Sequence, residues 1–183
     1  RMTDLSTQQR WSPMRQAAVN GVPLSAMMTV AMLLTMYADR LGLLGMLAPI
    51  AMFAVPAVSF LLLRRDYIAT KGEMTWGALW LDGCLSYILG AVIAGAVMYI
   101  VWRWIDPTWM PDRIDESIDL LKASNDAEMV KLASDMRTAV DSGLDFSARS
   151  LTPAFIWLAA FSGSLLSLIF APIVLTTTRI TKP

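Results

Sequence analysis

Residues 82–99 read DGCLSYILGAVIAGAVMY, and this stretch decides the fold of the chain. After its first residue, Asp82, it carries no charge and is rich in alanine, glycine and branched aliphatic residues. With its flanks it forms an apolar segment at 76–102, longer than the roughly 20 residues with which a helix crosses a bilayer. The stretch therefore predicts a transmembrane helix.

Three further segments, 17–37, 41–63 and 155–178, are also long and apolar enough to span a bilayer. The whole chain is 56% hydrophobic and 16% charged, whereas ordinary soluble domains carry about 25% charged residues. Prolines such as Pro23 and Pro56 are tolerated in membrane helices and indicate kinks. The sequence predicts an all-α, polytopic membrane protein in which residues 1–183 form a single integral membrane domain with four transmembrane helices.

The basic residues are distributed unevenly, which predicts an orientation because lysine and arginine favour the cytoplasmic side. The N-terminal tail, the segment after the second span and the C-terminal tail carry eight basic and three acidic residues. These are Arg1, Arg10, Arg15, Arg64, Arg65, Lys71, Arg179 and Lys182, against Asp4, Asp66 and Glu73. Residues 103–150 carry six basic and ten acidic residues. We therefore expect both termini to be cytoplasmic and 103–150 to be external, in the periplasm of a Gram-negative cell.

The external segment 103–150 has the pattern of two short amphipathic helices. Ile114, Ile118 and Leu121 are spaced four and three apart, and Ser124-Asn125-Asp126 then interrupts the pattern and offers a helix cap. A second apolar stripe follows at Met129, Leu132, Ala133, Met136 and Val140. We expect an external helical hairpin between the third and fourth spans, and its stripes need cover from each other, from the membrane or from a partner.

Aromatic residues gather where the third span meets its flanks. They are Trp76 and Trp80 at the entry and Trp102, Trp104 and Trp109 at the exit. Tryptophan prefers the headgroup level of a bilayer, so these residues are expected to be interface anchors. A stacking platform for sugar or lipid is the alternative.

Small residues recur along the third and fourth spans. They are Gly90, Ala94 and Gly95 in the third span and Gly163 and Ser167 in the fourth. Because small residues let helices approach closely within lipid, we expect these two spans to pack together. The sequence leaves open whether the contact lies within one bundle or between two copies of the chain.

Asp82 is the one ionisable residue inside a predicted span. An intramembrane charge is costly and is a functional-site hypothesis by default. Asp82, Ser86 and Tyr87 of the third span, with Asn20 of the first, form the candidate polar pocket. In the alternative, Asp82 lies shallow enough to meet water or to pair with a nearby arginine such as Arg65.

The residues that most enzymes need are scarce. The chain has no histidine and one cysteine, and it contains no nucleotide-binding, hydrolase or zinc signature. We therefore expect no catalytic residues, no metal site, no cofactor and no nucleic-acid partner.

The layout of residues 72–178 is similar to the bacterial membrane-protein family catalogued as domain of unknown function 4199. The likeness rests on GEMTWGALWLDGCLSYILGAVIAGAVMYIVWRWIDPTWM, the acidic helical segment after it and the final span. The resemblance implies four spans in the inner membrane of a Gram-negative bacterium, and it implies no activity. It also associates the chain loosely with polyprenyl-phosphate glycosyltransferases encoded nearby.

These observations lead to two hypotheses. The first is a non-catalytic accessory or scaffold protein of the inner membrane, assisting lipid-linked sugar or envelope synthesis. Its partners would be the lipid bilayer and a membrane protein, for example such a glycosyltransferase, or a second copy of the chain. The alternative is a small oligomeric transporter or channel that uses Asp82 and the kinked spans.

Overall fold

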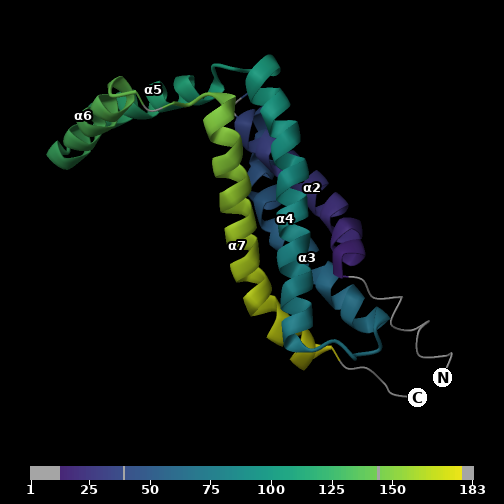
Figure 1. Ribbon diagram of the computed structural model, residues 1–183. Coiled ribbons are helices and arrows are strands. Elements are labelled where there is room, and N and C mark those ends of the chain that lie inside the picture. The colour runs from purple at the N-terminus through teal and green to yellow at the C-terminus, as the bar shows by residue number, and fades with distance from the viewer. Residues whose placement is uncertain (1–12, 39, 144, 179–183) are drawn as a thin grey trace, which may run out of the picture. The chain divides into compact units, whose positions relative to one another are not determined.

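The computed structural model describes residues 13–38, 40–143 and 145–178, and these are drawn as ribbon in Figure 1. Within them the chain contains six α-helices and no strand, which confirms the all-α class. In chain order the helices are α2 (Pro13–Met36), α3 (Leu47–Ala69), α4 (Trp76–Ile100), α5 (Trp109–Lys122), α6 (Ala127–Asp141) and α7 (Ala148–Thr177). A 3₁₀ turn, η1 (Gly42–Met46), precedes α3, and a π-helical turn, η2 (Val101–Ile105), follows α4.

Four helical segments are long and apolar enough to cross a membrane, as the sequence predicts. They are Met14–Met36, Leu47–Ala69, Trp76–Ile105 and Ala148–Thr177. Of the tail residues used for the predicted orientation, Arg1, Asp4, Arg10, Arg179 and Lys182 lie outside the described residues. The four segments support a membrane protein, and the orientation stays a prediction.

The chain divides into two compact units. Unit 1 comprises residues 1–96 and 155–183 and therefore holds α2, α3 and most of α4 and α7. Unit 2 comprises residues 97–154 and holds α5, α6 and the adjoining ends of α4 and α7. Each unit is described by itself below.

The second span differs from the sequence expectation at both ends. Gly42 adopts a left-handed backbone with φ +55°, and the 3₁₀ turn after it delays the α-helix to Leu47. At the other end α3 continues to Ala69, where Lys71 (φ 55°) and Gly72 (φ 77°) turn the backbone out of the helix. The segment Arg64-Arg65-Asp66, expected in a loop, is therefore part of α3.

Helix α4 packs closely against both α2 and α7 in unit 1. A Cβ at Gly90 would lie 3.3 Å from the carbonyl oxygen of Gly21 in α2. On the α7 side, a Cβ at Gly83 would collide with the side chain of Ser167, and a Cβ at Gly163 would collide with the Tyr87 ring. The Trp80 indole N–H also donates to the Ser164 carbonyl over 3.3 Å. Backbones approach at these glycines because no side chain separates them.

Unit 2 contains a helical hairpin in which α5 packs against α6. Each helix contributes one fully buried residue, Ile118 from α5 and Ala133 from α6. An ion pair of 2.7 Å joins Arg137 of α6 to Asp115 of α5. The Asp126 side chain caps α6 by accepting from the backbone N–H of Glu128 at 2.9 Å.

A buried polar cluster as the candidate functional site

Asp66, near the end of α3, is the best-connected acid of unit 1. Its residue is 2% exposed. The Gln16 side-chain amide donates to Oδ1 over 2.5 Å, and the Asn20 amide donates to Oδ2 over 2.5 Å. Both carboxylate oxygens are therefore satisfied by donors from α2, as a buried charge requires.

Arg65 completes this network and links it to the surroundings of the bundle. Its Nη2 donates to Oδ1 of Asn20 over 2.6 Å, and its Nε lies 3.3 Å from Oδ1 of Asp66. The Arg65 side chain is 52% exposed. Water or lipid headgroups therefore screen much of its attraction for Asp66, and its fixed bond to Asn20 orients the amide that holds the carboxylate.

Asp82, on α4, is fully buried and has a different environment. It is 0% exposed, and neither of its carboxylate oxygens accepts a hydrogen bond among the described residues. The charged groups that act on it are the Asp66 carboxylate and the Arg65 guanidinium. Two ionised carboxylates that lie close together in a buried site repel each other.

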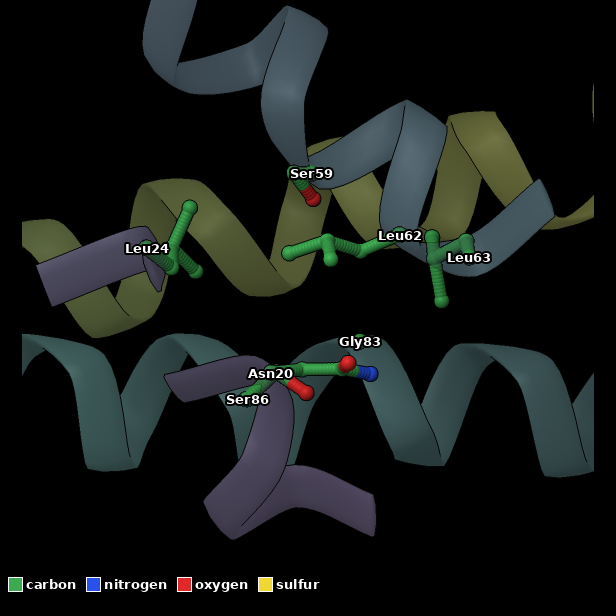
Figure 2. Close-up of a pocket in the computed structure, with 7 residues that line it drawn as sticks. All are labelled: Asn20, Leu24, Ser59, Leu62, Leu63, Gly83 and Ser86. Atoms are coloured by element: carbon green, nitrogen blue, oxygen red, sulfur yellow. The ribbon is translucent and has the colours of Figure 1, made fainter. Parts of the chain in front are cut away.

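A small cavity adjoins this cluster between α2, α3 and α4. Its volume is about 10 Å³, and Figure 2 shows its lining: Asn20, Leu24, Ser59, Leu62, Leu63, Gly83 and Ser86. This volume is about the size of one water molecule. The polar groups at its wall belong to Asn20, Ser59 and Ser86, so the cavity suits a water and excludes larger solutes.

The structure places the four predicted pocket residues around the cavity in different ways. Asn20 and Ser86 line the same cavity, and Asp82 lies one helical turn before Ser86 on α4. Tyr87 does not line the cavity, but it contacts Leu24 and Ser59 of the cavity wall while its ring packs against Gly163 of α7 and lines an apolar groove. Arg65 acts on Asp82, as the alternative of an arginine partner expects, and the depth of Asp82 in the bilayer stays a prediction.

Sequence reasoning missed Asp66, Gln16 and Ser59 as members of the cluster. It ended the second span at residue 63, where the hydropathy falls at two arginines. The signal that could have found Asp66 is helical spacing. Ser59, Leu63 and Asp66 are separated by four and three residues and are all buried on one face of α3.

The predicted packing residues are all buried, but they serve two contacts. Gly163 and Ser167 of α7 face α4, through Tyr87 and Gly83. Gly90 faces Gly21 and Leu24 of α2, and Ala94 joins a cluster with Leu24 and Met28. Gly95 is buried beside Ala94. The small face of α4 thus packs partly on α2 and not only on α7.

The five tryptophans predicted to be interface anchors differ in how exposed they are. Trp76 (46% exposed) and Trp80 (37% exposed) stack at 6.1 Å between ring centroids, and Trp104 is 67% exposed. Trp109 is half-buried, whereas Trp102 is 5% exposed and packs inside unit 2. Trp102 therefore does not present its ring to the surroundings of unit 2 as an anchor would.

An apolar groove of roughly 500 Å³ lies elsewhere in unit 1. It is lined by Met28, Ala31, Met32, Met52, Phe53, Val55, Pro56, Tyr87, Phe155, Leu158, Ala159, Ser162 and Leu166. Its size is within the usual range of ligand sites, but its few polar atoms offer little specific recognition. It suits hydrocarbon, either a lipid chain or an apolar helix.

Comparison with known proteins identifies the family. No curated protein and no solved structure matches the chain. The family described as "Protein of unknown function (DUF4199)" matches residues 16–176, which cover nearly the whole of the four apolar helices. The chain belongs to this uncharacterised family.

Proposed function

We propose that this protein binds and releases protons within the membrane at the Asp66–Asp82 pair, as a small proton-conducting transport protein. The observation that carries the proposal is Asp82. It is fully buried, it accepts no hydrogen bond, and it faces a second carboxylate. Ionisable residues in such positions mark proton relays and ion pathways in membrane proteins.

The small size of the cavity favours a proton over any larger solute as the transported species. A space of about 10 Å³ beside Asn20 and Ser86 has room for one water molecule. Protons pass between carboxylates and single waters, whereas a sugar or amino acid needs hundreds of cubic ångströms. Of the solutes that a transporter could move, we therefore propose the proton.

The geometry also supports a route to one end of the bundle. Gln16 lies near the start of α2, Asp66 near the end of α3 and Asp82 near the start of α4. Arg65 is the exposed member of the cluster. A proton would enter past Arg65, from the cytoplasm in the predicted orientation. Pro23 in α2 and Pro56 in α3 are where those helices would bend to open the other side.

Proton uptake into liposomes tests this proposal. The purified chain is reconstituted with a pH-sensitive dye inside, and a potassium diffusion potential is applied with valinomycin. We expect potential-driven acidification with the unmodified chain and its loss with Asp82→Asn. Asp119→Asn is the matched control, because Asp119 is exposed on α5.

Equal proton fluxes for the unmodified chain and Asp82→Asn would reject the proposal. So would fluxes no greater than those of empty liposomes. A loss of flux in Asp119→Asn as large as in Asp82→Asn would also reject it, because the effect would then not belong to the acid pair.

The apolar groove supports a second candidate function, a non-catalytic accessory subunit. Within a bilayer, helices associate through packing and not through water exclusion. A groove flanked by Met28, Met52 and Phe53 could seat an apolar helix of a membrane partner. A glycosyltransferase acting on lipid-linked sugars in the inner membrane is one such partner.

Affinity purification from native membranes in mild detergent tests the accessory role. A stoichiometric membrane partner that is lost with Ala159→Trp, which fills the groove, would support it. Recovery of the chain alone, or retention of the partner in that variant, would reject it. Ile93→Trp is the matched control, because Ile93 is an exposed residue of α4 outside the groove.

A further inference from the structure

Unit 2 contains a groove that differs from the cavities of unit 1 in its charge. Its volume is roughly 410 Å³, and its walls come from two segments far apart in the sequence. Trp102, Arg103 and Pro107 follow α4, and Asp145, Ser147, Ala148 and Arg149 surround the start of α7. The folding of unit 2 thus places two arginines on one groove.

These arginines are not used by the ion pairs of unit 2. Among its described residues, Arg113 pairs with Glu116, and Arg137 pairs with Asp115 and Asp141. Arg103 and Arg149 take part in none of these pairs, and both are exposed. Arg149 also lies in the first turn of α7, where a cation is unfavourable beside the positive end of the helix. Arg149 therefore does not stabilise the start of α7, and its exposed guanidinium can reach an anion in the groove.

Asp145 is the acid of the groove, and its oxygens are already engaged. Oδ1 accepts from the backbone N–H of Ser147 and Oδ2 from the Ser147 hydroxyl, each over 2.8 Å. The Ser147 backbone N–H and hydroxyl hold the pKa of the Asp145 carboxyl below its usual range, and Arg149 adds to this. Asp145 is thus ionised at neutral pH. It offsets one of the two positive charges and leaves the groove with a net positive charge.

Two exposed apolar residues follow Arg103 in the chain. Trp104 is 67% exposed and Ile105 is 65% exposed, directly after Arg103. Both belong to the end of the apolar segment Trp76–Ile105, which is long enough to span a membrane. Tryptophan at the end of such a segment favours the headgroup level of a bilayer. An anion at the groove would then lie next to hydrocarbon.

We propose that the Arg103–Arg149 groove binds the phosphate group of a membrane lipid. The guanidinium fork matches phosphate oxygens with paired hydrogen bonds, which an ammonium group cannot do. Trp104 and Ile105 would contact the upper part of the acyl chains. This site is independent of the acid pair in unit 1 and does not rest on proton transport.

Native mass spectrometry of the full chain in neutral detergent tests the site. The probes are phosphatidic acid, diacylglycerol with the same chains, and inorganic phosphate. We expect phosphatidic acid to bind at lower concentration than diacylglycerol and to resist competition by inorganic phosphate. Arg103→Gln and Arg149→Gln should each weaken phosphatidic acid binding about tenfold, because each removes charge-assisted hydrogen bonds.

Matched variants distinguish binding at a specific site from a general effect of the protein's positive charge. Lys131→Gln removes one positive charge from the exposed surface of α6 and should leave binding unchanged. Asp145→Asn removes the acid of the groove and should strengthen binding. Equal binding of phosphatidic acid and diacylglycerol would overturn the proposal, as would equal losses in Lys131→Gln and Arg103→Gln. If inorganic phosphate at the same concentration displaced the lipid, the proposal that the bound phosphate group belongs to a lipid would be rejected.

Discussion

At the scale of single residues, Asp66 and Asp82 are both buried acids in unit 1 but differ in what holds them. Asp66 accepts hydrogen bonds from Gln16 and Asn20. Asp82 accepts none among the described residues. A hydrogen bond to a charged group contributes about 1.5–3 kcal/mol, whereas a buried acceptor without a donor is a cost. Asp66 therefore stabilises the bundle, whereas an ionised Asp82 lowers its stability.

This difference predicts opposite results for two similar substitutions. Asp66→Asn should lower the free energy of unfolding by roughly 2 kcal/mol, because its amide would place a donor against the Gln16 or Asn20 donors. Asp82→Asn should leave stability unchanged or raise it, because it removes a buried charge and offers a donor to Asp66. Unfolding in mixed micelles with increasing denaturing detergent measures both. Equal losses in the two variants would contradict this account of the cluster.

At the scale of helices, glycine decides how closely α4 can approach its neighbours. Gly163 lies against the Tyr87 ring and Gly83 against Ser167, so an added methyl group has no room at either position. Gly77, also in α4, has no atom within 4 Å of an added Cβ. The chain thus offers contact and control positions with the same substitution.

Gly163→Ala and Gly83→Ala should each lower the free energy of unfolding by about 1–3 kcal/mol, the usual cost of overpacking. Gly77→Ala should raise it by about 0.5–1 kcal/mol, because alanine favours a helix over glycine. Thermal unfolding of the purified variants in detergent measures the order of their stabilities. If Gly163→Ala were as stable as Gly77→Ala, the close contact between α4 and α7 would be wrong.

The stability of the hairpin of unit 2 should depend more on its apolar contacts than on the ion pair between its helices. Ile118 is 1% exposed, so Ile118→Ala should cost about 2–5 kcal/mol. The Arg137–Asp115 pair is exposed, with side chains 49% and 60% accessible, so Arg137→Gln should cost less than about 1 kcal/mol. Amide hydrogen exchange in α5 and α6 reports both effects. Faster exchange in Arg137→Gln than in Ile118→Ala would reverse this ranking.

At the scale of the whole molecule, the distribution of charge predicts which segments lie on the same side of the membrane. Single cysteines in a Cys84→Ser background test it, at Glu73 in the loop before α4 and at Lys131 in α6. In intact cells a membrane-impermeant maleimide should label Lys131→Cys and should label Glu73→Cys only after permeabilisation. The reverse pattern would invert the proposed orientation, and labelling of both in intact cells would contradict four membrane crossings.

The sequence predicted the helical class and the number of apolar helices well, because apolar length is a property of each segment alone. It also singled out Asp82, because a charge in an apolar run is visible locally. It failed at the end of α3, where hydropathy falls at Arg64 although the helix continues to Ala69. The helix continues because Asp66 shares the buried face of Ser59 and Leu63 and finds donors on α2.

The sequence by itself therefore determined that the chain is helical, that four of its segments suit a bilayer and that Asp82 lies inside one of them. Only the tertiary structure decided that Asp82 faces Asp66, that Gly90 packs on α2 and that Arg103 and Arg149 line one groove. The physical reason is the separation along the chain of the residues that interact. Helix formation and hydropathy depend on neighbours along the chain, whereas each of these pairings joins helices whose rotation and depth are set by packing between them.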